Sequence, residues 1–274
     1  MIKIKINFTD WWHGFDKFDN YFYNLLKDEF EIEISDDPDY IFYSVFGNTH
    51  LNYKCTKIFY TGENIAPDLN YCDYSFSFDY IDDCRNYRLP LYLLYDGYYE
   101  LSNEKVINEN LVNRKFCNFV ASNGDCYNRN KFVEKLSKYK MVDSGGRFMN
   151  NIGSPVIDKR KFQSEYKFSI AFENNAYRPE HNGYTTEKIM EPMTTNSIPI
   201  YWGNPIIYKE FNTKSFVNYY DFNNDDDLIE YIIELDRNDD KYMELLKQPW
   251  FPEYNIPEVN KIDNIKYFLY KIFK

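Results

Sequence analysis

The chain has 274 residues, of which 44% are hydrophobic and 20% aromatic, so it is long enough for one or two domains with a substantial core. Its formal net charge is −11, from 32 Lys and Arg against 43 Asp and Glu, which excludes nucleic-acid binding through a broad basic surface. The 5 cysteines form no CxxC pair, and His13, His50 and His181 lie far apart, so neither a disulfide framework nor a metal motif is expected.

The start of the chain indicates where the protein resides. The segment MIKIKINF alternates Lys with Ile, as in a strand, and lacks the continuous apolar region of a signal peptide. No apolar stretch approaches the ~20 residues that a membrane-spanning helix needs. We therefore expect a soluble, cytoplasmic protein.

The first part of the chain predicts strands that alternate with a helix. Apolar or alternating runs predict strands over residues 2–8, 29–34, 39–45, 57–64 and 73–78. After the first of these, Phe18, Tyr21, Phe22 and Leu25 recur at helical spacing, which predicts a helix over 17–27. This β-α-β order indicates a parallel sheet flanked by helices.

The polar stretch 100–114 carries weak structural signals, and we place the crossing between two domains there. A second β/α series follows it, with strands at 115–121, 166–172 and 197–201, helices from Asn128 and from about Thr185, helical residues 224–247 and a last helix at 258–273. Two Rossmann-like domains with a cleft between them fit this order. In such open sheets, ligands bind at the carboxyl ends of the strands.

The domain boundaries follow from this crossing. We expect a first domain over residues 1–108 and a second over 109–257, with the last helix, 258–274, packing back on the first. Apolar side chains lie on one face of that helix, at Ile262, Ile265, Leu269 and Ile272, and four lysines add positive charge. The alternative for this helix is peripheral contact with a membrane surface.

The densest chemical signal lies in residues 166–218. A strand is followed there by a polar loop, 173–183, and by a helix that one of two adjacent threonines can cap. The free N–H groups of a first helical turn favour an anion, and Lys188 adds a full positive charge. A diphosphate suits this place, and Glu187 could accept hydroxyl groups from a ribose. From the residues alone, the alternative is an ordinary strand–helix unit with a capping glutamate.

The same segment carries FEN, Y-x-TEK, IPIYWG-x-P and SFVN in this order. Elsewhere the chain has INFTDWW at 6–12, FYTGEN at 59–64, DYSFSFDYID at 73–82, RLPLYLLY at 88–95, KFCNFVASN at 115–123 and GGRFMNNIG at 145–153. Together these motifs resemble the α-1,3/4-fucosyltransferases, glycosyltransferase family 10, over nearly the whole chain.

The resemblance implies a fold and a reaction. The fold would be GT-B, an α/β architecture of two facing Rossmann-like domains with parallel sheets, the first for the acceptor and the second for the donor. The donor would be GDP-β-L-fucose, and transfer would invert the anomeric carbon to give an α-linked fucose. The acceptor would be a hydroxyl of a GlcNAc-containing glycan, with α-1,3 the expected linkage.

The resemblance also implies a donor site. By position in the motifs, Arg129 and Lys188 hold the diphosphate, and a planar guanidinium suits bidentate contact with phosphate oxygens. Asn174 and Tyr184 match positions that line the donor site, and Glu187 matches the carboxylate on the ribose. The loop between Asn174 and Tyr184 is longer than the usual family form.

Three residues of the first domain are the catalytic and acceptor candidates. Glu63, in the TGEN turn, matches the proposed catalytic base of the family. Trp11 and Trp12 are candidates for a ring platform under the acceptor sugar, and their place at the end of a strand predicts that one ring is buried and the other exposed. Plain core packing is the alternative for both rings.

A metal is not expected in this mechanism. Two acidic triplets, 37–39 and 225–227, contain the letters of a DxD metal motif, and we interpret both as solvated or helix-capping because such triplets are frequent in an acidic chain. Arg, Lys and a helix start can neutralise the leaving diphosphate instead. No cofactor is therefore expected, and Mn²⁺ would at most stimulate transfer.

Two other functions remain open. One is a non-catalytic, carbohydrate-binding descendant of the fold, against which the presence of Glu63 and of the Arg129/Lys188 pair argues. The other is a transferase that uses a different GDP-sugar, which only competition among GDP-sugars would distinguish.

Overall fold

The structure is a computed structural model that describes residues 1–175 and 183–274. His181 and the middle of the loop that is longer than the family form lie outside the described residues. Within the two described ranges, no helix is both long and apolar enough to cross a membrane.

The described residues form two compact units. One consists of Met1–Leu94 and Pro257–Lys274, and the other of Tyr95–Ile256. The chain therefore enters the second unit after Leu94, earlier than the crossing expected at 108, and returns to the first unit at Pro257.

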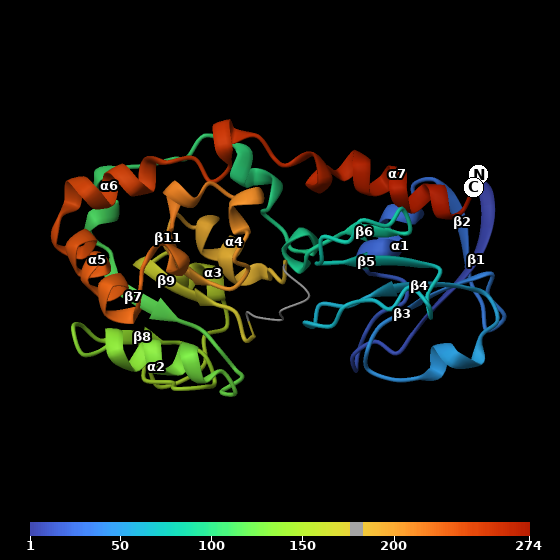
Figure 1. The fold of residues 1–274 in the computed structure, drawn as a ribbon, viewed down its shortest axis with the longest axis horizontal. Helices are drawn as coiled ribbons and strands as arrows, with labels where there is room; N and C mark the ends of the chain where they lie inside the picture. The colour runs from blue at the N-terminus through green and yellow to red at the C-terminus, as the bar shows by residue number, and fades with distance from the viewer. Residues whose placement is uncertain (176–182) are drawn as a thin grey trace. The chain divides into compact units, whose positions relative to one another are not determined.

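The first unit contains a parallel sheet of six strands (Figure 1). In chain order they are β1 (Ile2–Thr9), β2 (Phe30–Ile34), β3 (Tyr40–Tyr43), β4 (Thr56–Tyr60), β5 (Tyr74–Ser77) and β6 (Asn86–Arg88). The spatial order is β2-β1-β3-β4-β5-β6. All five strands expected in this part of the sequence are present, and Ile6, Ile41 and Ile58 on its central strands are completely buried.

Two helices belong to this unit. Helix α1 (Tyr21–Leu26) starts after Asn20, whose side chain accepts a hydrogen bond from the backbone N–H of Tyr23 at 3.0 Å. The helix is therefore shorter than the expected 17–27, because the cap at Asn20 fixes where it begins.

Helix α7 (Ile262–Ile272) packs on the first unit with its apolar face inward, beside the N-terminal strands in Figure 1. Ile265 and Leu269 are completely buried, and the ring of Phe273 lies 5.6 Å from that of Phe30. Two of its basic residues form ion pairs with the same unit: Lys266 with Asp28 at 3.4 Å and Lys274 with Glu29 at 3.3 Å. The face that a bilayer would have to receive is covered, so the membrane contact considered for this helix does not hold.

The second unit contains a parallel sheet of five strands in the order β11-β10-β9-β7-β8. These strands are β7 (Lys115–Phe119), β8 (Val142–Ser144), β9 (Tyr166–Phe172), β10 (Ile198–Trp202) and β11 (Val217–Asn218). The helices of this unit are α2 (Tyr127–Leu136), α3 (Lys159–Gln163), α4 (Glu187–Met193), α5 (Asp225–Arg237) and α6 (Asp239–Lys247).

The second unit differs from the expectation in two respects. The helical pattern 224–247 is two helices, because Asn238 is extended (φ −125°, ψ 97°) and its side chain caps α6 by accepting from the backbone N–H of Lys241 at 3.1 Å. Strands β8 and β11 were not expected, since two or three residues are too short for a periodic pattern to be visible.

Both sheets reverse their direction of growth at an interior position. In the first sheet, β1 lies between β2 and β3; in the second, β7 lies between β8 and β9. The connections from such a strand lead to opposite sides of it, which leaves a crevice at the carboxyl ends of the two strands involved. Ligands are therefore expected after β1 and β3 in one unit and after β7 and β9 in the other.

Candidate active site

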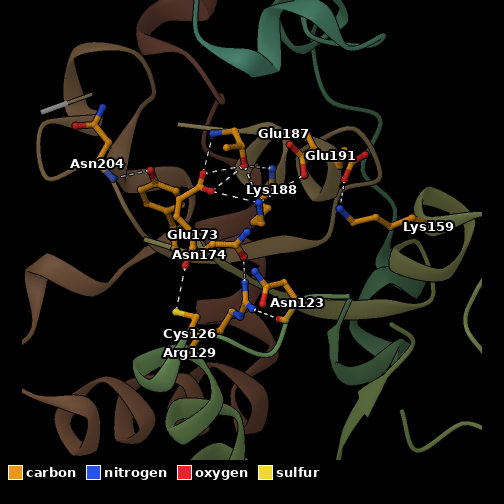
Figure 2. Close-up of polar contacts among 12 residues, drawn as sticks. Asn123, Cys126, Arg129, Lys159, Glu173, Asn174, Glu187, Lys188, Glu191 and Asn204 are labelled. Atoms are coloured by element: carbon orange, nitrogen blue, oxygen red, sulfur yellow. Dashed lines mark hydrogen bonds and ion pairs between the residues drawn. The ribbon is translucent and has the colours of Figure 1, made fainter. Parts of the chain in front are cut away.

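Polar side chains gather at the carboxyl ends of β7 and β9, where the second sheet reverses. Asn123 lies in the loop after β7, Arg129 in the first turn of α2, and Asn174 just beyond β9. The Arg129 guanidinium donates to Oδ1 of Asn174 and, at 2.5 Å, to the backbone carbonyl of Asn123 (Figure 2). The structure thus brings together Arg129 and Asn174, two of the expected donor residues, from two different strand ends.

Arg129 is only 1% exposed. Its Nη hydrogen bonds go to neutral oxygens, and its Nε has no hydrogen-bond partner among the described residues. Burial lowers the pKa of Arg129, and the neighbouring Cys126 and Glu173 oppose that shift. Because a buried charge with neutral partners is costly, a negatively charged ligand at this place would be stabilised.

A buried carboxylate follows β9. Glu173 is 0% exposed, and its Oε1 accepts from the backbone N–H of Thr186 at 2.7 Å, while its Oε2 lies 2.8 Å from the Thr186 hydroxyl. Lys188 donates from Nζ to that hydroxyl oxygen at 3.0 Å, and the same Nζ lies 3.4 Å from Oε2 of Glu173 (Figure 2). The hydroxyl of Thr186 also caps α4, as expected for one of the two threonines.

The charges around Lys188 hold it protonated. Burial by itself lowers the pKa of Lys188, but Glu173 and Glu187 outweigh that effect and raise it, while Arg129 acts in the opposite direction. Burial also raises the pKa of Glu173, against the attraction of Lys188. That Arg129 repels Lys188 means that two cations face one small region, which is typical of an anion site.

Glu187 and Tyr184 complete the expected donor residues. Oε1 of Glu187 lies 3.6 Å from Nζ of Lys188, and its side chain is 16% exposed. Burial raises the pKa of Glu187, but Lys188 and Lys159 outweigh it and hold the pKa below its ordinary value. Tyr184, two residues before the cap of α4, is 7% exposed.

The sequence analysis assigned no role to Glu173 or Asn123. A usable signal for Glu173 was its position directly after β9, a strand whose seven residues are all buried. An acid that continues such a strand must be buried with partners or mark a site. Asn123 could not have been found, because it acts through its backbone carbonyl.

Glu63 lies in the first unit, in the turn that follows β4. Its backbone N–H donates to the Thr61 hydroxyl at 3.1 Å, and its carbonyl accepts from the N–H of Ile65 at 2.7 Å. The residue is exposed. The turn is thus fixed by its own backbone, and the carboxylate is accessible at the carboxyl edge of the sheet.

The two tryptophans after β1 have different surroundings. Trp11 stacks on Phe15 at 4.3 Å between ring centroids and donates from its indole nitrogen to the carbonyl of Phe42 at 3.3 Å, so it belongs to the packed interior. Trp12 is 49% exposed and meets Phe46, which is 50% exposed, at 87° between ring planes. As expected, one ring packs inward and its neighbour faces solvent.

The exposed pair lies where the first sheet reverses. Phe46 follows β3, and its backbone N–H donates to the carbonyl of Asp10 after β1 at 3.0 Å. Phe46 was not among the residues expected from the sequence, because its proximity to Trp12 depends on the pairing of β1 with β3.

The acidic triplet 225–227 begins α5. The Asn224 side chain accepts from the backbone N–H groups of Asp226 and Asp227 at 2.8 and 3.0 Å, and Asp225 pairs with Lys135 at 2.9 Å. Over 1–175 and 183–274, no three His, Cys, Asp or Glu side chains are grouped so that they could hold a metal ion.

Two family models match the chain. Residues 6–95 match the α-(1,3)-fucosyltransferase FucT N-terminal domain, and residues 110–268 match the C-terminal part of glycosyltransferase family 10, fucosyltransferase. The chain is 34% identical to the α-(1,3)-fucosyltransferase FucT of Helicobacter pylori over 97% of its own length and 62% of that protein. It is 36% identical to α-(1,3)-fucosyltransferase B of Drosophila melanogaster over 45% of its length and 30% of that protein.

The fold has solved counterparts. A crystal structure described as an α1,3-fucosyltransferase with GDP-fucose is 28% identical, with a TM-score of 0.86 over 100% of this chain and 91% of that one. A structure described as the enzyme with GDP gives a TM-score of 0.84 at 29% identity, over 99% and 90% of the two chains. The α/β fold of GT-B type, with two parallel sheets, is confirmed, although the chain spans less than two thirds of the length of the curated relatives above.

Proposed function

The chain belongs to glycosyltransferase family 10, the fucosyltransferases, and we propose that it transfers L-fucose from GDP-β-L-fucose to a hydroxyl of a GlcNAc-containing glycan. The observation that carries this proposal is the convergence of Arg129, Glu187 and Lys188 at the carboxyl edge of the second sheet, close to the reversal between β7 and β9. Two cations and an accessible carboxylate suit a nucleoside diphosphate, because they offer partners for phosphates and for ribose hydroxyls.

In this proposal, the donor residues divide by chemistry. Arg129 and Lys188 contact the diphosphate, Glu187 accepts from the ribose hydroxyls, and Asn174 and Tyr184 line the site. The support for Asn174 is its hydrogen bond from Arg129, which would orient the guanidinium toward the ligand. As the bond from the anomeric carbon to the phosphate oxygen breaks, negative charge grows on GDP, and fixed positive charges stabilise it.

We assign the general base to Glu63. Its carboxylate would take the proton of the acceptor hydroxyl while that oxygen attacks the anomeric carbon from the face opposite GDP, so the configuration inverts. The transition state has oxocarbenium character, as in glycoside hydrolysis. The support is the exposure of Glu63 at the carboxyl edge of its sheet, together with its place in the TGEN turn.

The acceptor platform in this proposal is Trp12, with Phe46 as its second wall. Both rings are about half exposed and nearly perpendicular, and they follow the two strands where the first sheet reverses. A pyranose can stack its apolar face on such a ring. Trp11 would support the platform from below, since its ring stacks on Phe15 and its indole nitrogen is bonded to a backbone carbonyl.

Replacing Trp12 by Ala is expected to raise the KM for the acceptor while GDP affinity stays within about twofold, because the ring contacts only the sugar. A loss of about tenfold in kcat/KM corresponds to one stacking contact. Tyr71→Ala, at another exposed aromatic residue of the first unit, is the control. An unchanged acceptor KM in Trp12→Ala would remove the platform from the proposal.

We propose that the reaction needs no metal, because Arg129 and Lys188 already supply positive charge at the diphosphate. Transfer measured with excess chelator is expected to keep most of its rate, and added Mn²⁺ would at most stimulate it. Complete loss of transfer with chelator, restored by Mn²⁺, would show that a cation takes part and would contradict this assignment.

The test of the proposed function is a glycan array incubated with GDP-fucose and the full chain. Fucose incorporated on GlcNAc-containing glycans supports the proposal, and the linkage of the product decides whether it is α-1,3. Binding to glycans without transfer would indicate the non-catalytic alternative. Competition among GDP-sugars distinguishes fucose from another donor sugar.

A further inference from the structure

Glu173 is a completely buried carboxylate that the reaction described above does not use. Because it is 0% exposed, it has no surface with which to touch a donor or an acceptor. We propose that Glu173 is a positioning residue that keeps the Lys188 side chain charged and directed toward the donor diphosphate. This inference rests on the proposed function, since it takes Lys188 as a diphosphate ligand.

Contacts on both carboxylate oxygens fix the side chain of Glu173. Oε1 lies 2.7 Å from the Thr186 backbone nitrogen, and Oε2 lies 2.8 Å from the Thr186 hydroxyl oxygen. That hydroxyl accepts from Nζ of Lys188 at 3.0 Å, so the carboxylate, the threonine and the ammonium form one chain of hydrogen bonds (Figure 2). A lysine alone has four flexible carbons, and this chain selects one of its many rotamers.

The backbone of the next strand end presses on the same carboxylate. A Cβ added at Gly203, after β10, would lie 2.6 Å from Cγ of Glu173 and 2.5 Å from the hydroxyl of Tyr201. Only glycine allows this approach, since real Cβ atoms do not come so close to other heavy atoms. The glycine of the IPIYWG motif therefore makes room for Glu173 at the edge of the sheet.

The charge of Glu173 matters because Lys188 has mixed neighbours. The groups that act on it are Glu173 from the end of β9, Glu187 from its own helix, Arg129 from α2 and Tyr95 from the start of the second unit. Burial and Arg129 favour the neutral amine, whereas the two carboxylates favour the ammonium. Without Glu173, the balance shifts toward the neutral amine.

Glu187 cannot replace Glu173 in this role. It lies 3.6 Å from Nζ and is 16% exposed, so water weakens its attraction for the ammonium. In the proposed complex it also accepts hydroxyl groups of the ribose. Glu173 is shielded from both solvent and ligand, so its charge acts on Lys188 in the free protein and in the complex alike.

The experiment is calorimetry of GDP binding to the full chain at several pH values between about 7.5 and 9, a range below the ordinary pKa of lysine. Glu173→Gln keeps the shape and removes the charge, whereas Glu173→Asp keeps the charge and changes the shape. The matched control is Glu191→Gln, a buried carboxylate of the same helix as Lys188 that pairs with Lys159. Thermal melting checks that each variant is folded.

The parent protein, Glu173→Asp and Glu191→Gln are expected to change their GDP affinity by less than about twofold over this range. In Glu173→Gln the pKa of Lys188 falls, so the ammonium is lost as the pH rises and GDP affinity drops by at least about fivefold. A Glu173→Gln profile parallel to that of the parent would overturn the inference. If the parent itself binds no GDP, the proposed function fails instead.

A second measurement needs no variant of Glu173. Titration of the lysine Nζ signals by NMR, with Lys188 assigned from Lys188→Arg, gives the midpoint of this ammonium in the parent. It is expected to lie above the midpoint of the exposed Lys131. A midpoint at or below that of Lys131 would contradict the inference even if Glu173→Gln does not fold.

Discussion

Glu63→Gln is expected to lower the rate of fucose transfer by ~10²–10⁴, the usual contribution of general base catalysis. Glutamine keeps the size and a hydrogen-bonding oxygen of the side chain but has no basic carboxylate, so the acceptor hydroxyl keeps its proton. Affinity for GDP should change little, because Glu63 belongs to the first unit and the residues proposed for the diphosphate belong to the second. The variant should also lose the acidic limb of the pH–rate profile.

Steady-state kinetics with saturating GDP-fucose and varied acceptor measure this effect. If Glu63 only holds the acceptor, Glu63→Gln raises KM and leaves kcat nearly intact. Glu31→Gln, at an exposed position on strand β2, is the control for loss of one negative charge. A kcat within about threefold of the parent would remove Glu63 as the base.

Arg129→Ala and Lys188→Ala are each expected to weaken GDP binding by ~1.5–3 kcal/mol, the range for hydrogen bonds to charged groups. Each variant removes a cation that faces the proposed diphosphate position and leaves the phosphate oxygens with fewer donors. Arg129→Lys should lie between the parent and Arg129→Ala, because it keeps the charge but loses the planar pair of donors.

Calorimetry with GDP separates these losses from general charge effects. Lys138→Ala removes one positive charge from an exposed position of the same unit and should leave the affinity within about twofold. Because Arg129 is buried, each variant is first checked by thermal melting. Unchanged GDP affinity in both Arg129→Ala and Lys188→Ala would show that the phosphates bind elsewhere.

The outcome for the pair also bears on the role of Glu173. Lys188→Ala leaves Glu173 buried without its cation, so this variant should be less stable than Arg129→Ala leaves the protein at Asn174, a neutral partner. A comparison of melting temperatures without GDP therefore reports the ion pair alone, while calorimetry reports the ligand.

Much of the fold could be predicted from local patterns. The strands at the start of the chain and β7, β9 and β10 are apolar or alternating runs, and their periodicity is visible in the sequence. The short strands β6, β8 and β11 could not be predicted, because two or three residues contain no period. The division of 224–247 into α5 and α6 depends on one extended residue, Asn238, whose favourable side-chain cap competes with continuation of the helix.

By itself, the sequence determined the part of the candidate site that lies within one helical turn. Thr186, Glu187 and Lys188 are adjacent in the chain, and a threonine cap fixes their geometry wherever the helix lies. Only the tertiary structure decided which distant residues join them. Arg129 and Asn174 are 45 positions apart and meet because β7 pairs with β9, and Glu173 meets Lys188 because β9 leads into α4. Pairing between non-consecutive strands depends on the packing of the whole sheet, for which local periodicity contains no signal.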